Sequence, residues 1–188
     1  MNEKKMRRAE LLHIRNSIPD EDRHRQSGVI FELLKYLPEY KNAASVFLYI
    51  SVGSEVETTR IIEDCRACGR RIAVPLCNTA EHTMKAMEIS DLSMLDSGAY
   101  GISEPRRDLI QNGVISEMKM PELVIVPAIS FDLRRQRMGY GGGYYDRYLS
   151  DYVGFSVGLA YSECITECLP TAEYDRCVDV VICPERMI

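Results

Sequence analysis

Glycines and arginines crowd one segment of the sequence, from Phe131 to Arg147. Four of the 12 glycines fall within residues 139–143, and the arginines around them are Arg134, Arg135, Arg137 and Arg147. Clustered glycines cost backbone entropy, which indicates a sharp bend or a close approach of the main chain to a bound group. A helix is predicted to begin just after the glycines, so its free N–H groups and the arginine charges favour an anion, and we expect phosphate. A tight turn without a ligand would account for the glycines equally well.

The segment matches neither of the common phosphate-binding loops. No Gly-Lys-Ser/Thr follows, which excludes a Walker A loop, and Tyr144 occupies the last glycine position of the Gly-x-Gly-x-x-Gly pattern. The chain also lacks Gly-x-Ser-x-Gly and His-Glu-x-x-His motifs, and its three histidines are isolated. These absences are consistent with chemistry that needs no protein nucleophile.

The seven cysteines do not follow a metal-binding pattern. Cys65 and Cys68 form a C-x-x-C pair, but no second pair follows at zinc-ribbon spacing, and the later cysteines are scattered. We expect this pair to lie on a helix that Gly69 ends, with one thiol facing the core and neither reactive.

The elements that position these residues alternate between helix and strand. Apolar spacing and capping residues predict helices over Glu3–Arg15, Pro19 or Asp20 to Leu37, Thr58 or Thr59 to Cys68, Arg106–Gln111 and Tyr144–Ser150. Apolar and β-rich runs predict strands over Ser45–Ile50, Arg71–Leu76, Met84–Ile89, Leu123–Pro127, Phe155–Ala160 and Val178–Ile182. Pro38 is expected to end the second helix, and residues 78–120 give the weakest pattern.

This order of elements predicts the fold class. Residues 1–188 are expected to form a single three-layer α/β domain, with a mostly parallel, Rossmann-like open sheet flanked by helices. Ligands of such sheets bind beyond the carboxyl ends of the strands, here in the loops after Ile50, Leu76 and Pro127.

Composition limits the partners. The chain has 23 basic and 28 acidic residues and a net charge of −5, which disfavours general electrostatic binding to nucleic acid. Its apolar runs are too short to span a bilayer, and its charged first residues do not resemble a secretory signal. We expect a cytoplasmic protein that acts as a monomer and binds neither nucleic acid nor membrane.

Two linked segments resemble a family signature. Arg137–Arg147 (RMGYGGGYYDR) and the preceding Val126–Asp132 (VPAISFD) are similar to the signature of the 5-formyltetrahydrofolate cyclo-ligase family, also called methenyltetrahydrofolate synthetases. The resemblance extends over nearly the whole chain and is weakest over residues 78–120. It implies a ligase that uses ATP and Mg²⁺ to close 5-formyltetrahydrofolate to 5,10-methenyltetrahydrofolate, with release of ADP and phosphate. Phosphorylation of the formyl oxygen would let N10 of the folate attack, and that reaction needs only positioning and charge stabilisation.

The resemblance also implies roles for individual residues. ATP would be bound by Arg137, Met138, Gly139, Tyr140, Gly141, Gly142, Gly143, Tyr144 and Tyr145. The folate would contact Ile50, Glu55, Tyr140, Gly141, Gly142, Gly143 and Tyr144. The catalytic residues would be Arg137, Tyr144 and Asp146, and the magnesium ligands would be Asp146 and Asp179.

Three carboxylates of this set also have simpler interpretations. Asp146 follows the glycines, which suits an Mg²⁺ ligand beside phosphate oxygens, but a carboxylate there would equally stabilise the first turn of its helix. Asp179 would otherwise make local hydrogen bonds at a strand end. Glu55 would suit the N–H donors of a pterin ring, and would otherwise be a solvated loop residue or part of a helix cap.

Basic residues of the N-terminal helix share one face. At helical spacing these are Lys4, Arg7 or Arg8, and Arg15. In the family this segment supplies a lysine and an arginine to the ATP phosphates, which implies that role for Lys4, Arg7 and Arg8. If Met6 matches the family's apolar residue, Arg7 is the matching arginine, but Glu3 then stands at the lysine position. Lys4 or Lys5 would have to replace that lysine, and a solvated helix face stays the alternative.

Two other function classes stay open. A non-catalytic nucleotide- or folate-binding protein on the same fold would share these residues, and turnover would separate it from an enzyme. Arginines interleaved with tyrosines also suit single-stranded nucleic acid, although the net charge of −5 and the lack of a known RNA-binding motif disfavour that function. We therefore expect small-molecule substrates, a folate and ATP.

Overall fold

A fully buried apolar run, Leu123–Val126 (β6), forms the middle strand of a seven-stranded sheet. The strand order across the sheet is β12-β11-β9-β6-β1-β2-β3. The other strands are Arg186–Met187 (β12), Val180–Cys183 (β11), Phe155–Leu159 (β9), Ser45–Leu48 (β1), Arg71–Asn78 (β2) and Thr83–Ile89 (β3). The five central strands are parallel, and the edge strands β12 and β3 are antiparallel to their neighbours.

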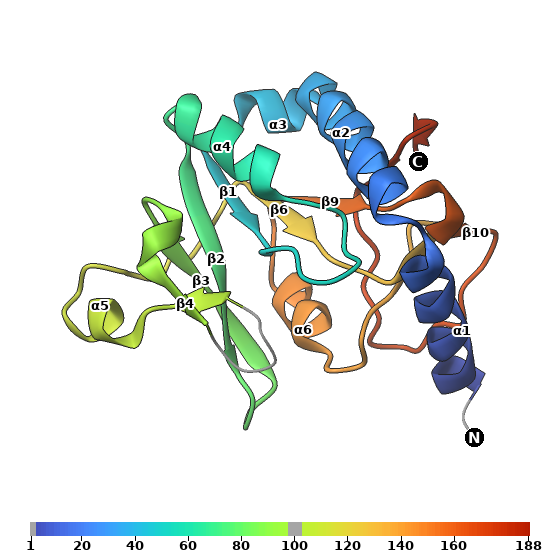
Figure 1. Cartoon of the computed structure of the whole chain (residues 1–188). Coiled ribbons are helices and arrows are strands. Elements are labelled where there is room, and N and C mark those ends of the chain that lie inside the picture. The colour runs from blue at the N-terminus through green and yellow to red at the C-terminus, as the bar shows by residue number, and fades with distance from the viewer. Residues whose placement is uncertain (1–2, 98–102) are drawn as a thin grey trace.

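Helices cover both faces of this sheet (Figure 1). The computed structural model describes residues 3–97 and 103–188. One face carries Asp20–Tyr36 (α2), Pro38–Asn42 (α3) and Thr59–Ala67 (α4), and the other carries Tyr144–Ser150 (α6). The N-terminal helix Glu3–Ser17 (α1) lies beside the sheet, near β10 (Ile165–Thr166). The predicted three-layer α/β class with a mostly parallel sheet is confirmed.

The βαβ unit of β1, α4 and β2 forms as its apolar pattern predicts. Ile61, Ile62 and Cys65 form the buried side of α4, and β1 pairs in parallel with β2. Gly69 follows the helix with a φ of 67°, a conformation that favours glycine. The parallel pairing sets the register of β1 and β2. The carboxyl ends of both strands lie at the edge where ligands of such sheets bind.

Several short elements were not expected. Helix α2 ends at Tyr36, but Pro38 begins α3 rather than a loop, because a proline suits the first helical position, where no N–H partner is needed. A small second sheet follows β6, with Ser130–Asp132 (β7) between β10 and Arg137–Met138 (β8). Within the weakly patterned region, Leu95–Ser97 (β4) pairs with Ser103–Pro105 (β5). The helix predicted over Arg106–Gln111 does form, as Arg107–Gln111 (α5).

None of the helices in the described part of the chain is both long enough and apolar enough to cross a membrane.

Gly158 is the point of closest packing between β9 and the small sheet. A Cβ atom at this position would lie 2.4 Å from the buried Phe131 ring. Because the core has no room for an added methyl group there, we expect Gly158→Ala to lower the free energy of unfolding by about 1–3 kcal/mol. Urea titration followed by circular dichroism measures this change.

The matched control is Gly28→Ala in α2. A Cβ atom at Gly28 would approach only the far end of the Arg60 side chain, at 3.0 Å, and alanine suits a helix interior better than glycine. This variant should be as stable as the unmodified chain or slightly more so. An unfolding midpoint of Gly158→Ala equal to that of Gly28→Ala would contradict the close packing.

Candidate active site

Three segments meet at the carboxyl edge of the sheet: helix α1, the loop over residues 51–58 after β1, and the chain that follows β6. The contacts of one side chain, Arg15, define this meeting point. Its guanidinium donates to Ser54 Oγ at 3.0 Å and to the Ala128 carbonyl at 3.0 Å. These segments carry most of the residues that the sequence singles out.

The glycine loop, residues 139–143, joins β8 to α6 by a sharp bend. Gly141 and Gly143 have φ values of 99° and 72°, which other residues rarely adopt. A Cβ atom at Gly142 would lie 2.7 Å from the Tyr144 ring, so this position also excludes a larger residue. The bend turns the chain into the first turn of α6, where Asp146 lies.

Helix α1 contacts the glycine loop through Arg8. Arg8 Nε donates to the Gly139 carbonyl at 2.8 Å, and a Cβ atom at Gly141 would lie 3.3 Å from the same guanidinium. Lys4, one turn earlier, pairs with Asp175. The structure thus places Arg8 and Lys4 beside the glycine loop and the segment that precedes β11.

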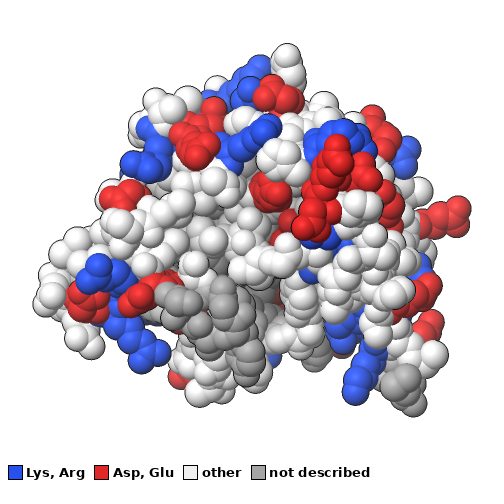
Figure 2. All heavy atoms as spheres, in the orientation of Figure 1, with Lys and Arg blue, Asp and Glu red and all other residues white. Residues whose placement is uncertain are grey.

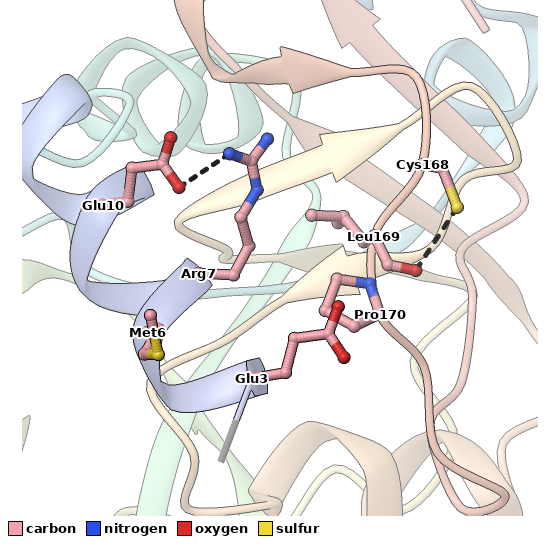
Figure 3. Close-up of a pocket in the computed structure, with 7 residues that line it drawn as sticks. All are labelled: Glu3, Met6, Arg7, Glu10, Cys168, Leu169 and Pro170. Atoms are coloured by element: carbon pink, nitrogen blue, oxygen red, sulfur yellow. Dashed lines mark hydrogen bonds and ion pairs between the residues drawn. The ribbon is translucent and has the colours of Figure 1, made fainter. Parts of the chain in front are cut away.

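Arg7 lies on another side of α1. Its guanidinium pairs with Glu10 at 2.8 Å. It lines a surface groove together with Glu3, Met6, Glu10, Cys168, Leu169 and Pro170 (Figure 3). Adjacent helical residues differ by about 100° in direction, so only one of two neighbouring arginines can face the loop. The alignment expected from the sequence matched Arg7 to the family arginine. In the structure Arg8 faces the glycine loop and Arg7 does not, so Arg8 suits a contact with the ATP phosphates better.

Arg137 and Asp146 form a largely buried ion pair below the glycine loop. Arg137 Nη2 donates to Asp146 Oδ1 at 2.6 Å, and only 6% of the Arg137 side chain is exposed. The backbone N–H of Arg176 donates to the same oxygen at 3.1 Å. Burial lowers the pKa of the Arg137 guanidinium, and Asp146 opposes that shift. The Nε atom of Arg137 is buried and finds no hydrogen-bond partner among the described residues.

Glu55 is buried and contacts the glycine loop through Tyr140. Its Oε2 atom accepts from the Val52 N–H at 3.0 Å, and its Oε1 atom accepts from the Tyr140 hydroxyl at 3.0 Å. The guanidinium of Arg15 donates in turn to the Tyr140 hydroxyl. With 8% of its surface exposed, Glu55 is not the solvated loop residue of the simpler interpretation.

The loop that carries Glu55 is held firmly from the sheet side. The Tyr161 hydroxyl, after β9, donates to the Glu55 carbonyl at 2.7 Å, and the Tyr49 hydroxyl donates to the Val56 carbonyl at 2.9 Å. Thr58 Oγ1 donates to the Tyr49 carbonyl at 2.9 Å and accepts from the Ser51 N–H at 3.1 Å. The Glu55 carboxylate is therefore fixed before any ligand arrives.

The two tyrosines that open α6 have different surroundings. The Tyr144 ring packs 5.7 Å from the His82 ring, in the turn between β2 and β3. The Tyr145 ring stacks on Phe47 at 6.3 Å, and its buried hydroxyl finds no partner among the described residues. Burial raises the pKa of this hydroxyl well above its usual range, so it stays a neutral donor. Ile50, half-buried, packs against the core after β1.

Asp179 lies at the amino ends of β9 and β11, away from the edge where Glu55 lies. Its Oδ2 atom accepts from the Ser156 N–H at 2.8 Å and from Ser156 Oγ at 2.6 Å. This is the local hydrogen bonding that its simpler interpretation describes, and it delays the start of β11 to Val180. A role of Asp179 in metal binding stays a prediction.

The C-x-x-C cysteines lie as expected on α4 and its end. Cys65 is buried, with its sulfur 3.5 Å from the Tyr40 hydroxyl, and Cys68 is exposed. Burial raises the pKa of the Cys65 thiol, which makes it less reactive. Among the described residues, no three His, Cys, Asp or Glu side chains gather as a set of metal ligands.

Arg15 makes more contacts in the site than the sequence indicated. It is 4% exposed and bonds from α1 to both of the other segments that meet at the sheet edge. Its position on the same helix face as Lys4 and Arg8 was the available signal. Its burial was not visible in the sequence, because its partners lie 39 to 125 positions away.

Charge on the visible surface is mixed. Figure 2 shows Lys and Arg side chains scattered among Asp and Glu, without a continuous basic stripe on that face. This arrangement gives the nucleic-acid alternative no support on the face shown.

Known proteins have the same fold and a similar sequence over nearly the full chain. A solved 5,10-methenyltetrahydrofolate synthetase from Aquifex aeolicus superposes with a TM-score of 0.83 at 30% identity, covering 98% of this chain and 91% of that one. A Mycoplasma pneumoniae protein of the same name has a TM-score of 0.73 at 19% identity, which supports the fold alone. The 5-formyltetrahydrofolate cyclo-ligase of Mus musculus is 27% identical over 93% of this chain and 90% of its own length.

These similarities place the chain among the ligases of α/β fold. It belongs to the 5-formyltetrahydrofolate cyclo-ligase family, whose sequence model matches residues 1–184. The family expected from the signature segment is thereby confirmed.

Proposed function

We propose that this chain uses ATP to close 5-formyltetrahydrofolate to 5,10-methenyltetrahydrofolate, with release of ADP and phosphate. One observation carries the proposal: the glycine loop contacts a cationic side chain and, through Tyr140, a buried carboxylate. Arg8 bonds to Gly139, Arg137 lies two residues before the loop, and Tyr140 of the loop bonds to Glu55. Groups suited to phosphate and to a pterin ring therefore surround one short segment.

The phosphate side of the site offers donors that lack acceptors. Arg137 Nε and the Tyr145 hydroxyl are buried without partners among the described residues, and unpaired buried donors are costly. Phosphate oxygens would satisfy them, and the Arg8 and Arg137 cations would balance the phosphate charge. The N–H groups of residues 139–143 would supply further donors.

The folate side of the site offers an acceptor. A pterin ring presents amino and ring N–H groups, which a carboxylate such as that of Glu55 accepts. Ile50, two residues after the end of β1, would supply apolar contact for the ring. The proposed contacts of Tyr144 with both substrates follow from its place between the glycine loop and α6.

The proposed reaction has two steps. The formyl oxygen attacks the γ-phosphorus of ATP, the bond from that phosphorus to the β,γ-bridging oxygen breaks, and ADP leaves. Nitrogen 10 then attacks the activated formyl carbon and loses its proton, and the carbon–oxygen bond breaks to release phosphate. Arg137 and the loop N–H groups hold the transferred group in line and stabilise its charge, so the protein needs no nucleophile.

Asp146 fits the Mg²⁺ that this reaction implies. Its hydrogen bonds from the described residues fall on Oδ1, and its side chain is 24% exposed, which leaves Oδ2 for a cation. Magnesium is commonly held by one or two carboxylates together with phosphate oxygens, whose charge it neutralises. Asp179 would be the second carboxylate only if it left its bonds to Ser156 at the amino ends of β9 and β11 and moved toward Asp146.

The direct test mixes the protein with 5-formyltetrahydrofolate, ATP and Mg²⁺ and follows the absorbance of the methenyl product. Product should form with all components present, and omission of ATP or addition of EDTA should stop it. Asp146→Asn should fold normally and lose most activity at limiting Mg²⁺, because the amide keeps the shape of the carboxylate but not its charge.

The unmodified chain in the same buffer without EDTA is the control. Full turnover without ATP, or with EDTA, would reject the mechanism. Binding of both substrates without any turnover would support the alternative, a non-catalytic binding protein. Asp146→Asn with full activity at low Mg²⁺ would reject Asp146 as a metal ligand.

A further inference from the structure

We propose that Arg15 is a positioning residue for the folate pocket, which fixes the Glu55 carboxylate through Tyr140 and balances its charge. This inference rests on the proposed function. It adds a residue of α1 to a pocket otherwise built from the loops after β1 and β6.

Arg15 joins three segments that the sheet alone does not hold together. Nε donates to Ser54 Oγ, Nη1 donates to the Ala128 carbonyl, and Nη2 donates to the Tyr140 hydroxyl. Only a guanidinium has several donors in a rigid planar fork, whereas a lysine has one compact ammonium group. The position therefore requires arginine for its geometry and not only for its charge.

The hydrogen bonds from Arg15 to Glu55 have a fixed direction. A guanidinium cannot accept, so the Tyr140 hydroxyl must accept from Arg15 and give its single proton to Glu55. The Arg15 guanidinium also lies 5.4 Å from the centre of the Tyr140 ring. Tyr140 is otherwise 54% exposed, so these contacts hold an exposed side chain over a buried carboxylate.

In this arrangement, each oxygen of Glu55 accepts one hydrogen bond, from the Tyr140 hydroxyl at Oε1 and from the Val52 N–H at Oε2. A carboxylate oxygen can accept two, so the N–H groups of a pterin can bond to Glu55 while both donors stay in place. Arg15 keeps its bonds to Ser54, Ala128 and Tyr140 and so holds the carboxylate during binding.

Arg15 is also the cation that acts on Glu55. Burial raises the pKa of Glu55, and the Val52 N–H, the Tyr140 hydroxyl and Arg15 oppose that shift. Tyr49 and Tyr145 also interact electrostatically with this carboxylate. Tyr161 bonds to the Glu55 carbonyl, and His24 pairs with Glu57 in the same loop. Burial raises the pKa of each of these tyrosines, so all are neutral near pH 7. Loss of the Arg15 charge would leave Glu55 protonated up to a higher pH.

The experiment measures the dissociation constants of 5-formyltetrahydrofolate and ATP separately, by calorimetric titration from acid to neutral pH. For Arg15→Gln, folate binding should weaken roughly tenfold or more, and ATP binding should not change. Folate binding should weaken as the pH falls and Glu55 becomes protonated, and we call this part of the pH dependence the acid limb. In Arg15→Gln the acid limb should move to higher pH. Arg15→Lys should restore the acid limb, because the charge returns, but not the full affinity, because the fork is lost.

Arg70→Gln is the matched control. Arg70 is also largely buried, pairs with Asp64 at 3.3 Å, and lies 4.4 Å from the centre of the Tyr40 ring. It follows α4 near the start of β2, at the opposite edge of the sheet from Glu55. This variant should lose stability but keep both dissociation constants and the acid limb.

Several outcomes would overturn the proposal. One such outcome is that Arg15→Gln binds folate as tightly as the unmodified chain. Another is that its affinities for ATP and folate fall equally. Either result would mean that Arg15 has only a general structural role. If Arg15→Gln does not fold, Arg15→Lys and Tyr140→Phe decide: Tyr140→Phe leaves α1 intact and should move the acid limb to higher pH. An unchanged acid limb in Tyr140→Phe would reject the connection to Glu55.

The unmodified chain and Glu55→Gln separate this inference from the proposed function. An unmodified chain that does not bind 5-formyltetrahydrofolate would end both. If it binds, and Glu55→Gln binds more weakly, the function stands and the Arg15 variants test the positioning role alone.

Discussion

Replacement of Arg137 by methionine is expected to lower kcat/KM for ring closure by about two to three orders of magnitude, the usual loss when one preorganised donor to a developing charge is removed. Arg137 lies two residues before the glycine loop, and its side chain is almost fully buried beside Asp146. Methionine keeps most of the volume and removes every donor. ATP binding should weaken in step, while the affinity for 5-formyltetrahydrofolate should stay within about twofold.

The control for this prediction is Arg134→Met. Arg134 lies three residues earlier, but its side chain is 60% exposed and it contacts Asp132 and Cys168. This variant should keep nearly full activity. Equal losses in both variants would show that the segment responds to charge in general, and the specific role of Arg137 would be wrong. Circular dichroism of both variants verifies that the fold is intact.

Glu55→Gln is expected to weaken 5-formyltetrahydrofolate binding by about 10- to 150-fold, the value of one charge-assisted hydrogen bond of about 1.5–3 kcal/mol. The amide keeps the shape of the side chain, but one of its ends becomes a donor and its charge is lost. ATP binding should not change, because the side chain of Glu55 bonds to Val52 and Tyr140 and not to the Arg137–Asp146 pair. Separate titrations of the two ligands measure the split.

Glu57→Gln controls for the loop itself. Glu57 lies two residues further on, is 42% exposed at its side chain, and pairs with His24 at 2.9 Å. Its substitution should leave both affinities unchanged. If Glu55→Gln weakened both ligands to the same degree, the glycine loop would not divide the site into a phosphate side and a folate side.

Local pattern was sufficient to predict the frame of the molecule. The run Leu123–Val126 is buried on both faces, and its composition showed that without knowledge of its neighbours. Helix α6 begins at Tyr144, as its position after the glycines predicted. The strands β7, β8 and β10 were missed, because each has only two or three residues. They are strands only because β7 pairs with both β8 and β10.

Side-chain direction was the information that the sequence did not contain. A shift of one residue on a helix separates Arg7, which pairs with Glu10, from Arg8, which bonds to Gly139. A motif with one ambiguous residue cannot resolve that difference. Asp179 shows the same limit, since its bond to Ser156 depends on the register between β9 and β11.

The contacts of α1 also bear on the order in which the molecule is assembled. Lys4, Arg8 and Arg15 bond to partners 171, 131 and 125 positions further along the chain. During synthesis this helix leaves the ribosome well before the glycine loop and Asp175, which emerge more than a hundred residues later. Contacts of such long range form late in folding, because chain closure must precede them. This helix is made well before its partners and is therefore among the last to dock, so the sheet can form while the site still lacks its α1 contacts.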